Sequence, residues 1–290
     1  MNKNHEEIIV VLSKSHLPAD LSTNLLDSTF LTIENSFFLV SDNWIANLVS
    51  FMTSTMPSFH GIRNTEDAEN KRLILTESFI NMLGSANIET DVFIQDEDLK
   101  RLAFLKLKDE SIPAENHAKV KLFIISRWER TLAEKISRIS SKNSFVLMIP
   151  LSSEERDNLI PMHVKNVGRK IMNTWERPFH AIIDIPPMLF TWMGLKLPYT
   201  WIKIAPNESR DAILVERGDR QNILIVEDHK IVIPKENYSG EIYDLNKDPQ
   251  EKHDLWDDPG SLELKSRLLI KFLSTKMGNE PMPMPRISAA

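Results

Sequence analysis

The sequence EIIVVLS, residues 7–13, is the stretch that decides the fold of this chain. Its apolar residues are mostly β-branched and follow one another without the alternation of a half-exposed strand. A continuous apolar run of this length is typical of a strand that is buried on both faces of a parallel sheet. We therefore predict a central first strand at residues 7–13.

Two further runs resemble the first. Residues 144–149 have the sequence SFVLMI, and residues 90–94, with the sequence TDVFI, form a weaker run. Helical patterns lie between them, over residues 43–55, 76–83 and 119–139, and Gly84 is placed to end the second of these helices in a left-handed cap. Strands that alternate with helices predict an α/β fold, in which a mostly parallel sheet is flanked by helices.

The pattern changes after residue 158. The sequence IPMHV at residues 160–164 predicts an edge or late strand, because proline is confined to such positions in a sheet. Residues 180–184 predict a strand end or turn. A helix should follow, with Asp184 as its N-cap, prolines in its first turn and Gly194 just past its end.

The C-terminal part predicts a small antiparallel sheet closed by a helix. Short strand patterns occupy residues 212–215, 222–227, 230–234 and 241–243, and an amphipathic helix pattern covers residues 262–273. We predict an α/β domain over residues 1–205, a small antiparallel subdomain with its closing helix over 206–280, and a tail over 281–290.

Composition excludes several classes of function. The 35 basic and 41 acidic residues give a net charge of -6, and this balance argues against a nucleic-acid partner. No run of apolar residues is long enough to span a membrane. The absence of cysteine rules out disulfides and thiolate chemistry. The apolar stretch near the start is too short for a signal peptide, so a cytoplasmic location is expected.

The sequence GEIYDLNKDPQEKHDLWDDP at residues 240–259 resembles the ending of bacterial sulfatases, which belong to the alkaline-phosphatase superfamily. Its Asp-Pro pair favours a turn that the neighbouring aromatic and leucine side chains can hold against the small sheet. Residues 49–62 are similar to the end of the family's nucleophile helix, 160–164 to a later strand, and 183–195 to a Val-Asp-Leu-x-Pro helix. The resemblance implies the sulfatase fold.

The same resemblance implies that the family's chemistry is missing. A sulfatase uses an aldehyde hydrate formed from cysteine or serine, and a divalent cation that carboxylates hold. The alignment places Trp44 at the modified residue, and Lys14 and Ser15 at the paired aspartates. Gln95 and Glu97 stand near the family's lysine and histidine. Because a lysine repels a divalent cation, we expect no metal and no other cofactor.

The resemblance therefore implies a degenerate and truncated sulfatase-like protein. The sequence PLSSE at residues 150–154 replaces the family's Asp-His-Gly, and the chain is short between residues 98 and 143. Our first hypothesis is a catalytically inactive protein, a pseudoenzyme, that binds a protein partner or a small molecule. A structural subunit of a larger complex, including a homo-oligomer, is a further possibility.

The alternative hypothesis is a divergent hydrolase or transferase that keeps the fold and uses other residues. It requires a set of weaker candidates to converge on one site: Ser50, His60, Ser152, Ser153 and His163. Each candidate also has a structural explanation. The histidines suit turns and surfaces, and the serines at residues 152–153 suit a helix N-cap.

Overall fold

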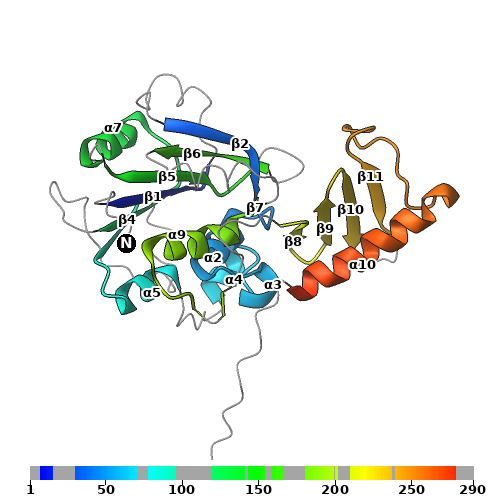
Figure 1. Cartoon of the computed structure of the whole chain (residues 1–290), viewed down its shortest axis with the longest axis horizontal. Helices are drawn as coiled ribbons and strands as arrows, with labels where there is room; N and C mark the ends of the chain where they lie inside the picture. The colour runs from blue at the N-terminus through cyan, green and yellow to red at the C-terminus, as the bar shows by residue number, and fades with distance from the viewer. Residues whose placement is uncertain are drawn as a thin grey trace, which may run out of the picture.

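The computed structural model describes residues 7–15, 30–70, 78–95, 119–140, 143–153, 159–165, 180–198, 200–201, 210–236 and 239–278. A large sheet has the strand order β3-β4-β1-β5-β6-β2-β7, and a small sheet has the order β11-β10-β9-β8. Figure 1 shows the two sheets side by side, with α10 lying along the small one.

The strands of the large sheet are β1 (Ile8–Ser13), β2 (Phe30–Phe38), β3 (Thr90–Ile94), β4 (Val120–Ile125), β5 (Phe145–Pro150), β6 (Leu159–Lys165) and β7 (His180–Ala181). Those of the small sheet are β8 (Ile213–Arg217), β9 (Gln221–Val226), β10 (His229–Pro234) and β11 (Glu241–Asp244). The helices are α2 (Trp44–Thr53), α3 (Pro57–His60), α4 (Thr65–Asn70), α5 (Phe79–Ser85), α7 (Arg130–Ile139), α9 (Ile185–Met193) and α10 (Leu262–Gly278), with short 3-10 turns η2 (Ile182–Asp184) and η3 (Pro259–Ser261).

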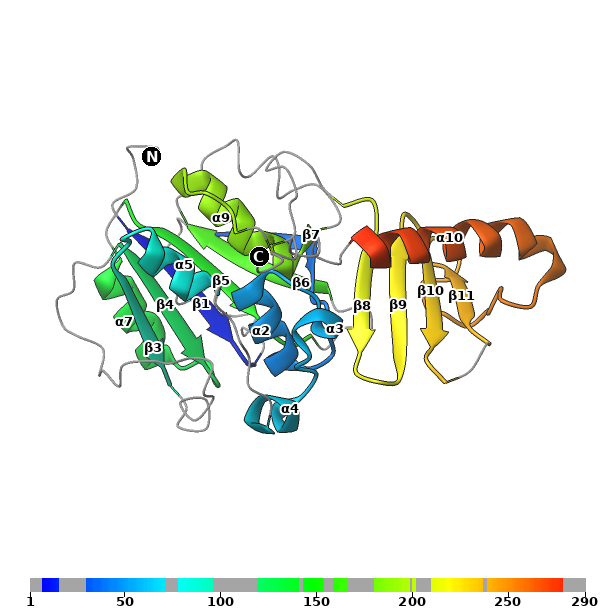
Figure 2. The same ribbon diagram turned by 90° about the horizontal axis from the view of Figure 1, so that it is seen from below.

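The prediction of a central, doubly buried first strand is confirmed. β1 pairs in parallel with β4 on one side and with β5 on the other, and every one of its residues is buried. Its side chains alternate between two hydrophobic clusters. Val10 and Leu12 join the cluster that includes α2, α5 and α9, while Ile9 and Val11 pack with α7 on the opposite face. Figure 2 shows the same layers from below.

Two local predictions were wrong. Residues 119–139 form β4 followed by α7 instead of one long helix. Lys121 interrupts the apolar run of β4 in sequence, yet it is buried and its ammonium pairs with the Glu7 carboxylate, so the strand tolerates the charge. Gly84 lies inside α5 instead of capping it, and the cap is at Ala86.

The strand β2 was not predicted, and its pairing with β6 places β6 inside the sheet instead of at an edge. β6 lies inside the sheet, antiparallel to both β5 and β2. Pro161 is tolerated there because the β5 pairing covers only the far end of β6, from His163 to Lys165. The pairing with β2 also shifts register between Ile33 and Phe37, close to this proline.

The segment around Asp184 matches its predicted outline. β7 runs into η2, α9 begins with two prolines, and Gly194 ends it in the left-handed conformation at φ 74°. Asp184 occupies the N-cap position of α9, but its carboxylate is used elsewhere. It accepts hydrogen bonds from the Ala181 backbone N–H at 2.8 Å and from the Arg210 guanidinium at 2.6 and 2.8 Å.

The small C-terminal sheet and its helix are also as predicted. The close approach of Gly240 to Trp256 joins the edge strand to the turn that follows it. A Cβ added at Gly240 would lie 2.4 Å from the Trp256 ring and 2.6 Å from the Val232 carbonyl oxygen, so only glycine fits here without movement. Among the residues in the ranges above, no helix is long and apolar enough to cross a membrane.

Candidate functional site

The carboxyl ends of the parallel strands form the edge at which ligands of open α/β sheets usually bind. Ser13 at the end of β1 is in register with Ile125 of β4 and with Pro150 of β5. The residues that directly follow these strands therefore lie next to one another. Lys14 directly follows β1, and Ser152 is the second residue after β5; both were singled out from sequence.

A buried asparagine fixes the start of α2 against this edge. The Asn47 Oδ1 accepts the backbone N–H groups of Val40 and Ser41 at 3.2 and 3.0 Å. Its Nδ2 donates to the carbonyl oxygens of Ser41 and Leu151 at 2.9 and 3.0 Å. Because Leu151 directly follows β5, this amide ties the helix to the strand end. Sequence reasoning missed Asn47, which looks like an ordinary helical polar residue.

Trp44 is the first residue of α2. Asn43 caps the helix by accepting the Ile45 backbone N–H at 3.0 Å. The Lys14 ammonium lies over the Trp44 ring, 4.8 Å from its centroid. This distance is within the range of a cation–π contact, worth about 0.5–1 kcal/mol at a partly exposed site. Lys14, at the position where the resemblance requires a metal ligand, thus contacts Trp44, at the position where it requires the nucleophile.

The Lys14 segment is held further by the loop after β5. The Ser152 hydroxyl donates to the Lys14 carbonyl oxygen at 2.5 Å, and the Lys14 backbone N–H donates to the Ile125 carbonyl oxygen at 2.7 Å. Ser152 therefore serves as a structural link between two strand ends. Its hydroxyl proton is committed to a carbonyl oxygen and not to a base.

Gln95 lies at the outer part of the same edge, directly after β3. Its Oε1 accepts the backbone N–H of Arg127 at 3.3 Å, and its own backbone N–H donates to the Ile124 carbonyl oxygen at 3.0 Å. These bonds join the ends of β3 and β4. Glu97, the other position predicted from the resemblance, lies outside the described residues.

The residues at this edge do not fit a divalent cation of the kind that the sulfatase fold implies. Such a cation needs several converging oxygen ligands, most of them carboxylates. Lys14 instead brings a positive charge, and an indole such as that of Trp44 offers no acceptor atom. Within the described ranges, no group of three or more histidine, aspartate or glutamate side chains is arranged so that it could hold a metal ion.

The structure brings Ser50 and His60 together, as the alternative hypothesis requires. Their Oγ and Nε2 atoms lie 2.9 Å apart, linking α2 to α3. Ser50 is fully buried. The other imidazole nitrogen, Nδ1, accepts the backbone N–H of Ile62 at 3.1 Å. A neutral imidazole has one donor and one acceptor nitrogen, so this bond assigns the proton to Nε2.

That proton places His60 in the wrong state for base catalysis. Nε2–H donates toward Ser50, and a hydrogen bond with the Ala46 backbone favours the charged ring. A general base must instead accept the proton of its serine. Desolvation by burial lowers the pKa of His60 to about 3, and the bond to Ala46 offsets this only in part. The pair is therefore neutral and serves to lock the two helices together.

The remaining candidates lie elsewhere. The Ser153 hydroxyl donates to the Leu159 carbonyl oxygen at 2.9 Å. His163 is a buried residue of β6, opposite Met148 of β5 and Thr32 of β2. Ser152 and Ser153 are thus bonded to backbone carbonyl groups, and His163 lies within the sheet between β5 and β2. The convergence that the alternative hypothesis needs is limited to one serine and one histidine.

A second link, also missed from sequence, joins the two sheets. The buried Glu216 of β8 accepts the backbone N–H and the hydroxyl of Ser58, both at 2.7 Å, and its own backbone N–H donates to the Val40 carbonyl oxygen at 2.8 Å. Ser58 and Glu216 are 158 residues apart, so no local pattern indicates this contact. It fixes the small sheet next to α3.

Comparison with solved structures identifies the fold. No protein-family model and no curated protein sequence matches the chain. A 2-O GAG sulfatase superposes with a TM-score of 0.68 at 11% identity, over 94% of this chain and 92% of the other. The phosphonate monoester hydrolase of Agrobacterium radiobacter gives 0.64 at 9% identity, over 94% and 96%. The phosphonate monoester hydrolase of Silicibacter pomeroyi gives 0.65 at 9% identity, over 99% and 98%. The chain therefore has the α/β fold of these sulfatases and phosphonate monoester hydrolases.

Proposed function

We propose that this protein is a non-catalytic member of the sulfatase-like fold, which acts by binding a protein partner or a small molecule. The observation that carries the proposal is the contact between Lys14 and Trp44 at the carboxyl edge of the parallel sheet. An ester hydrolase of this fold needs an attacking atom and a cation at that edge. An ammonium group stacked on an indole supplies neither.

The environment of these two residues supports the same proposal. The Ser152 hydroxyl is bonded to the Lys14 carbonyl oxygen, and Asn47 uses its whole amide to bind backbone groups. Polar groups at this edge that resemble catalytic ones are thus used to hold the backbone. Such bonds stabilise the edge, and they commit the Ser152 hydroxyl and the Asn47 amide to backbone groups.

The alternative, a divergent hydrolase, has one observation in its favour, which is the Ser50–His60 hydrogen bond. Three features oppose it. Ser50 is fully buried, the proton of His60 lies on the nitrogen that faces Ser50, and the lowered pKa makes the imidazole a weak proton acceptor. We therefore assign this pair a structural role.

The experiment is a turnover assay on the purified full chain. Aryl sulfate, aryl phosphate and phosphonate monoester substrates are each tested with calcium, magnesium, manganese or zinc added singly. We expect no turnover above buffer in any combination, because the Lys14 charge repels the cation and an indole stands at the position of the family's nucleophile.

Matched variants separate the chain's own activity from contamination. Trp44→Ala and His60→Asn alter the two candidate sites, and Lys276→Gln alters an exposed residue of α10 as a control. A rate that is equal in all three variants comes from a contaminant. A rate that Lys276→Gln retains and that Trp44→Ala or His60→Asn abolishes would contradict the proposal.

A further inference from the structure

The outer face of α10 carries four of the five large apolar side chains that are exposed in the described part of the chain. They are Leu262, Ile270, Leu273 and Met277, with exposed fractions of 68%, 69%, 59% and 73%. Single exposed apolar residues are common on soluble proteins, but a group of them on one helix indicates an interaction surface.

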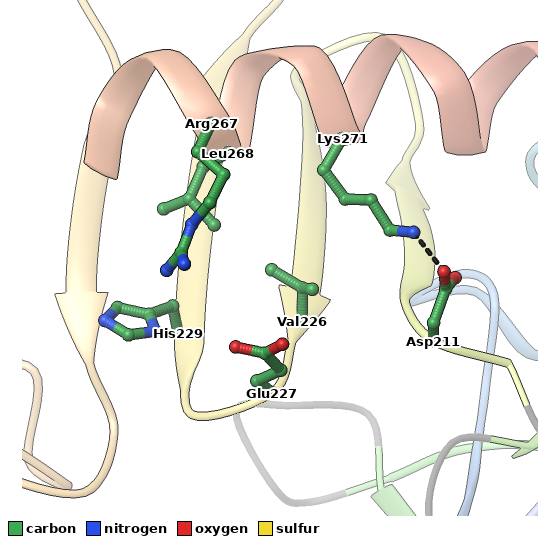
Figure 3. Close-up of a pocket in the computed structure, with 7 residues that line it drawn as sticks. All are labelled: Asp211, Val226, Glu227, His229, Arg267, Leu268 and Lys271. Atoms are coloured by element: carbon green, nitrogen blue, oxygen red, sulfur yellow. Dashed lines mark hydrogen bonds and ion pairs between the residues drawn. The ribbon is translucent and has the colours of Figure 1, made fainter. Parts of the chain in front are cut away.

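These four side chains lie on the side of α10 that faces away from the small sheet. They are 8, 3 and 4 residues apart, which is close to one or two helical turns. The buried residues Leu268 and Phe272 lie on the opposite side. Figure 3 shows that inner side, where Leu268 lies toward the strands and the Lys271 ammonium pairs with the Asp211 carboxylate. The outer face is therefore left without such contacts.

The spacing of the outer row is the same in both directions along the helix. We call this row the α10 stripe, and it consists of Leu262, Ser266, Leu269, Ile270, Leu273 and Met277. Its successive members are 4, 3, 1, 3 and 4 residues apart. The Ser266 hydroxyl donates to the Leu262 carbonyl oxygen of the same helix at 2.9 Å, so this small side chain does not interrupt the row with a free donor.

A row with this symmetry matches a second copy of itself in antiparallel orientation. When the midpoint between Leu269 and Ile270 lies on a two-fold axis, Leu262 of one copy is level with Met277 of the other, and Ser266 is level with Leu273. A small residue then faces a large one, which favours close packing of the two helices. A two-fold interface uses the same surface on both copies, so no second surface is required.

The charges at the two ends of α10 favour the same orientation. The first turn carries the acidic Glu263, and the last turn carries the basic Lys276. Antiparallel pairing about the midpoint brings Glu263 of one copy level with Lys276 of the other. Parallel pairing would place each charge opposite the same charge and would align the two helix dipoles, and both arrangements are unfavourable.

The size of the stripe suits a weak dimer. α10 has 17 residues and is therefore about 25 Å long. Four large and mostly exposed side chains on each of two copies account for on the order of 1,000 Å² of covered surface, which is near the lower limit for a specific interface.

We propose that two copies of this chain form a symmetric dimer through the α10 stripe, with the two helices antiparallel. Ile270 lies beside the two-fold axis, and Leu262 of each copy packs against Met277 of the other. The dimer goes beyond the proposed function and does not rest on it, because α10 lies on the small sheet and the Lys14–Trp44 contact lies at the edge of the large one.

Sedimentation velocity on the full chain at a series of concentrations measures the dimer. We expect a reversible monomer–dimer equilibrium with a dissociation constant of about 1–100 μM, because a small interface binds weakly. Ile270→Glu buries a charge in the stripe and should raise this constant about tenfold or more. Phe59→Glu is the matched control. It makes the same kind of change at the fifth exposed apolar side chain, on α3, and should leave the constant unchanged.

Cross-linking tests the orientation of the helices. The chain contains no cysteine, so single-cysteine variants give no background. With a short bis-maleimide, Ile270→Cys should cross-link to itself. Leu262→Cys should not, because the two copies of residue 262 lie about 22 Å apart along antiparallel helices. A mixture of Leu262→Cys with Met277→Cys should cross-link.

Four results would overturn the proposal. The first is a chain that stays monomeric over the whole concentration range. The second is an equal effect of Ile270→Glu and Phe59→Glu, with circular dichroism showing that both variants are folded. The third is self-cross-linking of Leu262→Cys as efficient as that of Ile270→Cys, which would indicate parallel helices. The fourth is a monomer that binds phosphatidylglycerol vesicles and loses this binding in Ile270→Glu, which would assign the stripe to a lipid surface.

Discussion

The His60 imidazole should make the stability of this protein depend on pH. In the folded protein its pKa is lowered from 6.5 to about 3, chiefly because burial removes the water that would solvate the charged ring. The unfolded chain therefore binds a proton at a pH where the folded protein does not. Stability that is fully present above pH 6.5 must be lost as the pH falls from 6.5 toward 3.

The magnitude follows from one proton. Each pH unit between the two pKa values costs about 1.36 kcal/mol. At pH 5 the unfolded His60 is largely protonated and the folded one is neutral, so the free energy of unfolding should fall by about 2 kcal/mol relative to pH 7. Acidification to pH 4 should extend the loss to about 3 kcal/mol, because the folded residue is still mostly neutral there.

The assay compares urea unfolding of the wild type and His60→Asn at pH 7 and pH 5. Asparagine keeps an acceptor for the Ile62 N–H and does not titrate, so the other titrating groups cancel in the difference between the two proteins. The wild type should lose about 2 kcal/mol more than the variant on acidification. Equal losses in both proteins would show that His60 is not held neutral by burial.

The remaining predictions concern three buried contacts. Asn47→Ala should lower the free energy of unfolding by about 3 kcal/mol or more, because it leaves buried backbone groups unsatisfied. Loss of the neighbouring helix cap in Asn43→Ala should lower it by only about 1 kcal/mol. Equal effects of the two substitutions in urea unfolding would contradict this prediction. Arg210→Ala should lower the free energy of unfolding by about 3–5 kcal/mol, because it leaves the Asp184 carboxylate buried and unpaired. A change below about 1 kcal/mol in the same assay would refute the role of this ion pair. Gly240→Ala should cost about 1–3 kcal/mol and change tryptophan emission, because the new methyl group displaces the Trp256 ring; an unchanged spectrum and stability would argue against the close contact.

The central sheet could be predicted from sequence because its strands are covered on both faces. β1 and β5 are continuous apolar runs, and each is buried along its whole length. β4 could not be predicted in this way because Lys121 interrupts its apolar run. The buried lysine is explained by the Glu7 carboxylate on the neighbouring segment, because this carboxylate pairs with the Lys121 ammonium group.

The small C-terminal sheet was predicted for a different reason. Its strands are short and separated by clear turn residues, and the Asp-Pro turn that follows β11 fixes the order of the elements. By contrast, β2 contains polar residues in its middle and a shift of register, so its sequence shows neither a continuous nor an alternating pattern.

The candidate site was only partly predictable. The resemblance placed Lys14 and Trp44 at positions from which ligands and nucleophile are missing, but it did not indicate that the two side chains contact each other. The Ser50–His60 pair was suggested by residue type alone. Its tautomer depends on the Ile62 backbone N–H, and backbone geometry of this kind cannot be inferred from residue identity.

The most direct test of the central claim is a crystal structure of the full chain grown with saturating manganese, with anomalous data collected at the metal's absorption edge. We expect the Lys14 ammonium to lie over the Trp44 ring and no anomalous peak to appear at the carboxyl ends of β1 and β5. A manganese ion held by side chains at that edge, with Lys14 turned away from Trp44, would contradict the account.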